Sequence, residues 1–472
     1  MGRSRAVVAM WSMVFLGLGL RLVQFLREPA VWHDEAALII NVLGKTYHEM
    51  LGVLFHAEAA PPLFMMIERA IVQILGDDGV QALRLFPFLA SCLSLVLFAG
   101  FSRQILTPWS AVWAVALFAT SDRLLWHCCE AKPYALDTLV GVMLAIGFHR
   151  AQTGSFALWT FGMAALAPAL LWLVFPACFM YGGVILALMP KLWRQGRTLD
   201  YVAWFTLGVM VLAGFAALYF GPIKAQRCDA MDSCWTRLFP DWSRPWSVPL
   251  WSLASTLEVV RYILKPTGNF LIGVLAVGAV SLWRSPHRAL LASFVIPLGL
   301  VYVASCLHSY PYGAARIIVF AAPGIILMIG AGIEPVWRWL AGYHRWAPAL
   351  LIVPLLVPIG QGVYRTVVPW DRADTDAAAN YVIERIQPGE QVTFNTWEYE
   401  YYFRDLSVPP HYCINGVFPD ADRVWLVFSS SYVDERMEWI AHFTRGWKQV
   451  DRKDFVFSTA VLLERTTQPD DF

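Results

Sequence analysis

Two adjacent carboxylates, Asp34 and Glu35, follow the first long apolar run of the chain and stand directly after His33. A carboxylate whose pKa is tuned by burial can act as a general base when it reaches a hydroxyl group. The pair could instead hold a metal ion, pair with basic groups, or be two solvated acids of a loop. Because charges beside a long apolar segment are costly to keep there, we expect a functional role.

A second group of polar residues contains His56 and Glu58, which precede Pro61-Pro62, and Arg84, which opens the next apolar segment. An arginine at the end of a membrane helix often extends to the lipid headgroups. The alternative is that Arg84 binds a phosphate group, because the guanidinium group matches phosphate geometry.

The densest group of ionisable residues runs from Trp126 to Asp137 and includes Glu130, Lys132 and Tyr134. It lies between two apolar segments, where ionisable side chains often mark a substrate path. Lys132 is a candidate phosphate ligand, and Glu130 is its candidate partner or a contact to the acceptor. A salt bridge at the membrane interface is the structural alternative.

A fourth group, at the start of another apolar segment, contains Tyr310, Tyr312 and Arg316. An arginine again stands at the outer end of a predicted helix, and the tyrosines could stack on a sugar ring. A structural and a functional interpretation fit this group equally well.

The elements that must position these groups are membrane helices. Of the 472 residues, 58% are hydrophobic and 15% charged, whereas a soluble domain averages about 25% charged residues. We therefore predict a polytopic membrane protein. Its net charge of +1 gives no sign of nucleic-acid binding. Cys228 and Cys234 could form a disulfide in an oxidising compartment, a question that the sequence leaves open, whereas Cys128 and Cys129 are expected to be buried thiols.

A membrane helix needs about 20 largely apolar residues, and we predict about eleven spans. They lie near residues 6–26, 85–106, 108–127, 134–149, 156–171, 173–190, 200–221, 268–283, 289–306, 317–337 and 347–368. If residues 61–76 form an amphipathic interfacial helix rather than a span, the short basic loops share one side, which is then the cytoplasm. The opposite, non-cytoplasmic side receives residues 27–84, 122–133, 222–267 and 307–316 and everything after about 368.

The chain changes character after about residue 368, where charges become frequent and apolar runs shorten. Residues 374–385 predict an amphipathic helix that ends before Pro388-Gly389. Residues 391–395, 423–429 and 455–463 predict strands. We therefore predict an α-helical polytopic membrane domain over residues 1–368, followed by a small soluble α/β domain over residues 369–472.

In this order, the four groups resemble the membrane-embedded glycosyltransferases of the GT-C class, which use lipid-linked sugars. The resemblance is greatest to bacterial relatives of the protein O-mannosyltransferases and of the lipid A aminoarabinose transferase, and it covers residues 6 to about 340. The motifs that carry it are Trp32-His33-Asp34-Glu35, Pro61-Pro62-Leu63, Ala82-Leu83-Arg84-Leu85 and Glu130-Ala131-Lys132-Pro133-Tyr134.

The resemblance implies an inverting transfer of a sugar from a polyprenyl-phosphate donor, with Asp34 as general base beside Glu35. It also implies that Arg84, Lys132 and Arg316 hold the donor phosphate. Further candidates for substrate contact are His33, His56, Glu58, Glu130, Tyr134 and Tyr312. No cofactor is expected to be required, although a divalent cation that bridges the acids to the phosphate stays open. The acceptor, whether a glycan, a lipid or a protein, is left open as well.

The main alternative is a transporter or flippase for a lipid-linked or small anionic substrate. Transporters place ionisable groups near the middle of the membrane and break helices at paired positions. Here the charges, apart from Arg21, gather toward one side, and no internal repeat is found. A non-catalytic protein that docks partners through its outer domain is a second alternative, which does not account for Asp34 and Glu35.

Overall fold

The computed structural model describes residues 2–228, 233–408, 410–412, 419–430 and 433–466. The chain forms two compact units. The helical unit consists of Met1–Arg27 and Thr46–Val368, and the C-terminal unit consists of Glu28–Lys45 and Pro369–Phe472. The short segment with the two acids, which the sequence assigned to the membrane domain, is therefore grouped with the C-terminal unit.

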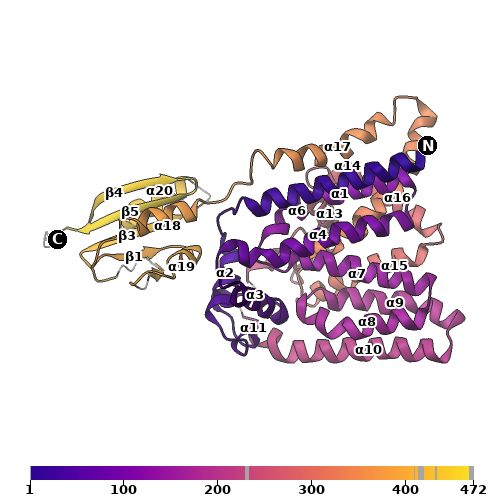
Figure 1. The fold of residues 1–472 in the computed structure, drawn as a ribbon, viewed down its shortest axis with the longest axis horizontal. Helices are drawn as coiled ribbons and strands as arrows, with labels where there is room; N and C mark the ends of the chain where they lie inside the picture. The colour runs from indigo at the N-terminus through magenta and orange to yellow at the C-terminus, as the bar shows by residue number, and fades with distance from the viewer. Residues whose placement is uncertain (1, 229–232, 409, 413–418, 431–432, 467–472) are drawn as a thin grey trace. The chain divides into compact units, whose positions relative to one another are not determined.

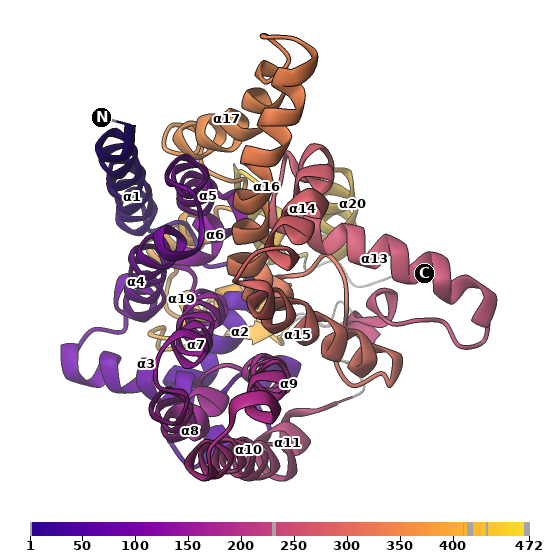
Figure 2. The same cartoon turned by 90° about the vertical axis from the view of Figure 1, so that its right-hand side faces the viewer.

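The helical unit is built from long helices that run in similar directions, and Figure 2 views most of them end-on. Its α-helices are α1 (Gly2–Leu26), α3 (Pro62–Leu75), α4 (Val80–Ile105), α5 (Pro108–Thr120), α6 (Asp122–Trp126), α7 (Tyr134–Thr153), α8 (Phe156–Leu173), α9 (Ala177–Gln195), α10 (Thr198–Leu218), α11 (Lys224–Gln226), α13 (Val248–Ile263), α14 (Gly268–Trp283), α15 (Arg288–Cys306), α16 (Ala322–Tyr343) and α17 (Ala349–Tyr364). Shorter helical turns are η1 (Glu49–Leu51), η2 (Phe55–Ala57), η3 (His127–Cys129), η4 (Tyr219–Ile223), η5 (Thr236–Leu238), η6 (Pro245–Ser247) and η7 (Arg316–Ala321).

Each segment predicted to cross the membrane contains one of these helices. Among the described residues, six helices are long and apolar enough to span a bilayer alone, or up to eight if each of two bent pairs is one span. The bent pairs are Asp122–Cys129 with Tyr134–Thr153, at 116°, and Pro245–Ile263 with Gly268–Trp283, at 103°. α5 and α17 are apolar but shorter. The chain is thus a multi-pass membrane protein.

Two segments that were predicted to lie outside the membrane contain helices, of which the sequence analysis predicted one and missed the other. Residues 61–76 form α3, whose 14 residues measure about 21 Å at 1.5 Å per residue, less than the about 30 Å apolar thickness of a bilayer. Pro62 stands at its first position, where the missing N–H costs no hydrogen bond. Loop 222–267, by contrast, contains α13, which the sequence analysis did not predict.

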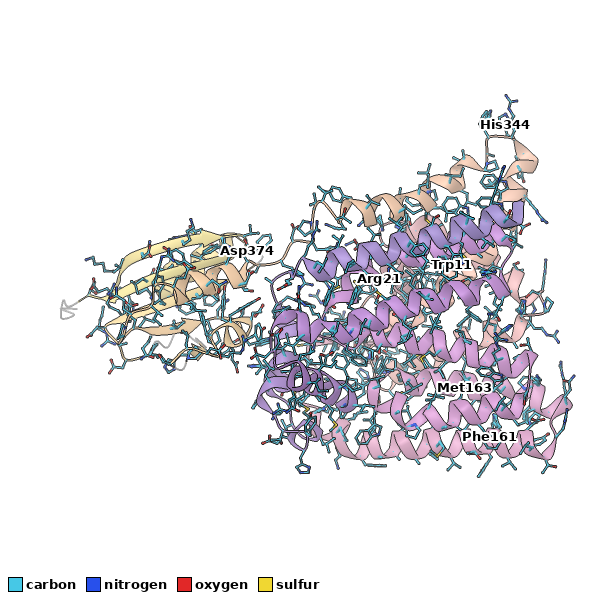
Figure 3. All side chains as sticks on the ribbon, in the orientation of Figure 1. Trp11, Arg21, Phe161, Met163, His344 and Asp374 are labelled. Atoms are coloured by element: carbon cyan, nitrogen blue, oxygen red, sulfur yellow. The ribbon has the colours of Figure 1, made fainter. Side chains whose placement is uncertain are left out.

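A buried arginine joins three neighbouring helices of this unit. Figure 3 shows Arg21 on α1, and its guanidinium group donates to the hydroxyl of Ser91 in α4 at 2.8 Å. It also donates to the carbonyl oxygens of Ala119, at the end of α5, at 2.9 Å and of Gly17 at 3.0 Å. A charge inside a membrane bundle requires such partners. Arg21 therefore ties α1 to α4 and α5.

The helices α14 and α16 approach so closely that two glycines leave no room for a side chain. A Cβ atom added to Gly278 would lie 1.7 Å from the carbonyl oxygen of Met328. One added to Gly332 would lie 2.0 Å from the carbonyl oxygen of Val274. Small residues are typical of helix contacts in membranes, where close packing drives association. The two glycines therefore set the distance between α14 and α16.

The C-terminal unit is built on a five-stranded sheet with the strand order β2-β1-β3-β5-β4. Its elements are α2 (His33–Gly44), α18 (Thr375–Ile383), β1 (Gln391–Phe394), α19 (Glu398–Tyr402), β2 (His411–Tyr412), β3 (Arg423–Ser429), α20 (Val433–Phe443), β4 (Trp447–Phe455) and β5 (Ser458–Arg465). β1 pairs in parallel with β2 and β3, whereas β5 pairs antiparallel with β3 and β4.

Helices cover both faces of this sheet (Figure 1). On one face, Trp425 and Val427 of β3 lie in a core with residues of α18 and α19. On the other face, Leu426 and Phe428 of β3 lie in a core with residues of α20. Successive side chains of a strand point to opposite faces, so a continuous apolar strand such as β3 needs a layer on each side. The unit is therefore a three-layer α/β arrangement.

Four elements of this unit have a counterpart in the sequence prediction, whereas α2, α19, β2, α20 and β4 were not predicted. α18, β1 and β3 lie where a helix and two strands were expected. The prediction of a strand over 455–463 is wrong at its start, because Phe455 ends β4 and Ser458 begins β5. Between them Phe457 turns the chain with a φ of 57°.

Two pairs of cysteines were considered from the sequence. Cys128 and Cys129 are buried thiols whose sulfur atoms lie 3.2 Å apart, as expected. Cys228 and Cys234, whose pairing the sequence left open, are both free thiols in the structure. Cys228 follows α11, whereas Cys234 lies two residues before η5.

Candidate active site

Segments that the sequence placed outside the membrane meet at one end of the helical unit. The side-chain amide of Gln226 exchanges two hydrogen bonds of 3.2 Å with the backbone of Ala60. The backbone N–H of Tyr312 donates to the carbonyl oxygen of Leu238 at 3.1 Å. Loop 222–267 is therefore joined both to the segment before α3 and to the loop before η7. Figure 1 shows the starts of α4 and α7 at the same end of the helices.

The turn between α6 and α7 is organised by a fully buried carboxylate, Glu130. One of its oxygens accepts the indole N–H of Trp126 at 2.6 Å, and the other lies 2.6 Å from Nδ1 of His127. Nε2 of His127 in turn lies 2.9 Å from the hydroxyl group of Tyr262 in α13. Glu130 thus holds the turn together and links it to α13. The sequence gave Glu130 as a candidate partner of Lys132, and the structure adds a second carboxylate, Glu58, as a partner of that lysine.

Lys132 pairs with Glu58, and the two side chains join the α6–α7 turn to the segment before α3. The Nζ–Oε2 distance is 2.5 Å, and the side chains are only 2% and 10% exposed. Bringing two charges out of water is costly, and their mutual attraction must offset this cost. The ammonium group of Lys132 is therefore a buried positive charge that pairs with the carboxylate of Glu58.

Arg316, at the start of η7, contacts the same turn from another direction. Its Nε donates to the hydroxyl oxygen of Tyr134 at 2.7 Å. Its guanidinium carbon lies 5.3 Å from the centre of the Trp235 ring, a cation–π contact. The ring of Tyr134 lies 4.9 Å from that of His127. Arg316, Tyr134 and His127 therefore form one connected cluster with Glu130.

Arg84 lies near the start of α4 and is 1% exposed. α4 packs against η3, and Arg84 lies near Cys129 of η3. The helical unit therefore brings Arg84, Lys132 and Arg316 to the surroundings of a single turn, between α6 and α7. Three cations from distant parts of the chain share this region.

Two other candidates have mainly structural surroundings. His56 is half-buried in η2 and has a left-handed φ of 57°. Tyr312 is buried beside the rings of Trp251 and Tyr302, and its hydroxyl group lies 3.0 Å from that of Thr256. Burial raises the pKa of Tyr312, so it stays a neutral phenol. Tyr312 holds the loop before η7 against α13.

The acidic pair lies in the C-terminal unit, in the first turn of α2, where carboxylates interact favourably with the helix dipole. Asp34 is half-buried, whereas Glu35 is fully buried. Oε2 of Glu35 lies 3.5 Å from Nη1 of Arg372. The ring of His33, an exposed residue, meets the ring of Trp397 edge-on at 6.1 Å. Asp34 is therefore the more accessible of the two acids, and Glu35 is part of an ion pair.

Three residues of these surroundings were missed from the sequence: Tyr262, Arg372 and Glu398. Tyr262 lies on the unpredicted helix α13, and Arg372 is 337 residues away from Glu35. Glu398 is 6% exposed, and burial raises its pKa to about 7. None of them belongs to a motif, although the acidic and aromatic run from Trp397 to Tyr402 is an unusual composition for a surface helix. In the part of the chain that the structure describes, no three His, Cys, Asp or Glu side chains come together in a way that could hold a metal ion.

Solved structures with a similar arrangement exist. ArnT from Cupriavidus metallidurans bound to undecaprenyl phosphate is 12% identical to this chain, with a TM-score of 0.53 over 99% of each chain. ArnT from the same organism in the apo state is 12% identical, with a TM-score of 0.55 over 95% of this chain and 97% of that one. The archaeal oligosaccharyltransferase AglB from Archaeoglobus fulgidus, in complex with an inhibitory peptide and a dolichol-phosphate, has a TM-score of 0.48 at 10% identity, over 99% of this chain and 75% of that one.

The likeness to ArnT includes both the long helices and the C-terminal sheet, because it extends over nearly the whole of both chains. The chain has the GT-C fold. The predicted fold class, a polytopic helical protein with a small C-terminal α/β domain, is thereby confirmed. No protein-family model matches the chain, and no curated protein matches it. The GT-C likeness is therefore one of architecture.

Proposed function

We propose that this protein is an inverting glycosyltransferase that moves a sugar from a polyprenyl-phosphate donor to an acceptor of the cell envelope. The observation that carries the proposal is the meeting of Arg84, Lys132 and Arg316 around one turn of a GT-C fold. Three cations gathered beside apolar helices match an anionic headgroup on an apolar chain. The shared architecture with ArnT bound to undecaprenyl phosphate supports the same class of donor.

The cations would bind the donor phosphate and stabilise the charge that it gains when the sugar leaves. Arg84 and Arg316 supply guanidinium groups that can bind phosphate oxygens in pairs. Lys132 is held by Glu58 at 2.5 Å, and an arriving phosphate would compete with that carboxylate for the ammonium group. Fixed positive groups that face the developing charge lower the barrier to transfer.

Asp34 would act as the general base. The acceptor oxygen or nitrogen attacks C1 of the sugar as the bond between C1 and the phosphate oxygen breaks, through an oxocarbenium-like state. The electron pair of the broken bond leaves with the phosphate, and the acceptor proton passes to Asp34. A single displacement inverts the configuration at C1. Asp34 suits this role better than Glu35, because Glu35 is fully buried beside Arg372.

The remaining candidates divide by their surroundings. His33 is exposed beside Asp34 and is the best candidate for a contact to the acceptor. Tyr134 and Glu58 would contact the donor indirectly, through Arg316 and Lys132, to which they are bonded. Glu130 and Tyr312 would shape the region through the contacts described above, and His56 would do so through the turn η2. The direction of the basic loops supports a bacterial inner membrane, with the site and the C-terminal unit in the periplasm.

The test is transfer from a panel of radiolabelled polyprenyl-phosphate sugars in membranes, with wild type, Asp34→Asn and the matched control Asp405→Asn compared. Asp405 lies in the same unit and its side chain is 85% exposed. Loss of general base catalysis should lower transfer by about 10²–10⁴-fold in the Asp34 variant alone. Equal transfer by all three proteins would refute the role of Asp34. If wild type consumes no donor of the panel, the transferase proposal fails and the transporter or flippase alternative replaces it.

A further inference from the structure

The start of α2, which carries the acidic pair, is held by side chains of the C-terminal unit. The backbone N–H of Val31 donates to the hydroxyl oxygen of Tyr402 at 2.8 Å. The hydroxyl group of Thr375 donates to the carbonyl oxygen of Val31 at 3.2 Å. The indole N–H of Trp397 donates to the carbonyl oxygen of His33. Three side chains from α18, α19 and the turn before α19 therefore fix the backbone directly before Asp34.

Arg372 adds the contact that reaches the acids themselves. Its Nη1 donates to the carbonyl oxygen of Ala30 at 2.9 Å and lies 3.5 Å from Oε2 of Glu35. The side chains of Arg372 and Glu35 are 9% and 0% exposed. One guanidinium group thus contacts both the backbone that precedes α2, at Ala30, and the second acid of the helix, Glu35. A planar, rigid group suits such a bridge better than a flexible ammonium group does.

The N-terminus of α2 receives a further partner from the same unit. Trp32, at the cap position, supplies no side-chain hydrogen bond to the helix. The carboxyl group of Glu398 accepts the backbone N–H of His33. Backbone N–H groups in the first turn of a helix have no partner within the helix and need one from outside. α2 is therefore capped by α19 rather than by its own sequence.

We propose that the C-terminal unit is a positioning part of the catalytic machinery, with Arg372 as the positioning residue that orients Asp34 through Glu35 and Ala30. This rests on the proposed function and deepens it. A domain outside the membrane could serve to select the acceptor. The contacts instead make it responsible for the geometry of the base, so that loss of its contacts affects every transfer, whichever acceptor is used.

The expected effect follows from how sharply catalysis depends on position. A displacement of about 1 Å in a catalytic group can lower the rate by about 10²-fold. Arg372→Ala should therefore lower kcat by about 10²-fold. The KM for the donor should change little, because the phosphate-binding cations belong to the helical unit. Arg372→Lys keeps the charge but not the planar group, and its kcat should lie between those of wild type and Arg372→Ala.

The experiment compares full-length wild type, Arg372→Ala, Arg372→Lys and Trp397→Phe with the control Arg385→Ala. Arg385 is in the same unit, is 43% exposed and pairs with its neighbour Glu384. Each protein is measured for kcat and KM, and for hydrogen exchange of the backbone over residues 31–44. Trp397→Phe removes only the indole donor, so it provides a milder test if Arg372→Ala does not fold.

The proposal predicts faster exchange in α2 and a lower kcat for the Arg372 and Trp397 variants, with Arg385→Ala equal to wild type. Unchanged exchange in α2 together with an unchanged kcat would overturn it. A fall in kcat with a parallel rise in KM and no change in exchange would overturn it too, because it would point to a donor contact. If wild type transfers no sugar but hydrogen exchange in α2 becomes faster in the variants, the proposed function is refuted, whereas the role of Arg372 and Trp397 in ordering α2 is supported.

Discussion

The buried pair of Lys132 and Glu58 allows an effect on the stability of the protein to be distinguished from an effect on its transfer activity. Lys132→Met removes the ammonium group from a carboxylate that is 10% exposed. Breaking a buried ion pair by removing one partner costs about 3–5 kcal/mol. The cost should lie near the lower end, about 3 kcal/mol, because Glu58 keeps a hydrogen bond from the N–H of Ala59 at 3.1 Å. Methionine preserves most of the volume of the lysine chain.

A second substitution should repair the stability but not the transfer. In Lys132→Met/Glu58→Gln neither charge of this pair is left buried without the other, so the free energy of unfolding should return to within about 1 kcal/mol of wild type. Transfer should stay low in both variants. The loss of one group that stabilises the charge of the leaving phosphate typically costs about 10²–10³-fold in kcat.

The assay is thermal unfolding of the purified protein in detergent, combined with transfer from the donor that wild type uses. Lys448→Met serves as the matched control, because its pair with Glu464 is 69% and 42% exposed and should contribute less than about 1 kcal/mol. Wild-type transfer by the double variant would refute the role of Lys132 in phosphate binding. Wild-type stability of the single variant would refute the strength assigned to the ion pair.

Three further predictions concern other parts of the chain. Burial raises the pKa of Glu398 from 4.5 to about 7, so wild type should lose up to about 3 kcal/mol of stability as the pH rises from about 4.5 to about 7, with no further loss above. Glu398→Gln should not show this fall, and melting temperatures at pH 5 and pH 8 test it. Arg21→Met should destabilise the protein by about 1–3 kcal/mol, because carbonyl oxygens in α1 and α5 lose their buried donor, whereas the same change at the exposed Arg103 should have no measurable effect on melting. Treatment with EDTA should leave transfer unchanged, since cationic side chains are proposed to neutralise the phosphate; loss of transfer that Mg²⁺ or Mn²⁺ restores would contradict this.

The sequence predicted the helical unit well for a physical reason. In a bilayer every backbone group must be bonded within the segment, so long apolar runs such as 85–106 become helices with few alternatives. α13 was not predicted because its first residues lie in a loop rich in Trp and Pro, and because a bent pair of helices divides the apolar run into short parts. The charged strand β4 was not predicted for a different reason, because an exposed edge strand does not show the alternation of apolar and polar residues that identifies a half-buried strand.

The candidate site was predictable in its residue types but not in its pairings. The cations Arg84, Lys132 and Arg316 stand out as charges at the ends of apolar segments. Which carboxylate faces Lys132 depends on tertiary packing, and Glu58 is 74 residues away from it. The same holds for Arg372 and Glu35, because an isolated arginine after the last span has no local signal.

The grouping of Glu28–Lys45 with Pro369–Phe472 also has a consequence for biosynthesis. The backbone of Ala30 is bonded to a side chain 342 residues further along the chain, and contacts of such long sequence separation form late in folding. A ribosome has to complete almost the entire protein before α2 receives its supports. Nascent and prematurely terminated chains would therefore enter the membrane with the proposed phosphate-binding residues but without an ordered support for the proposed base, which would protect the cell's pool of lipid-linked sugars from wasteful breakdown.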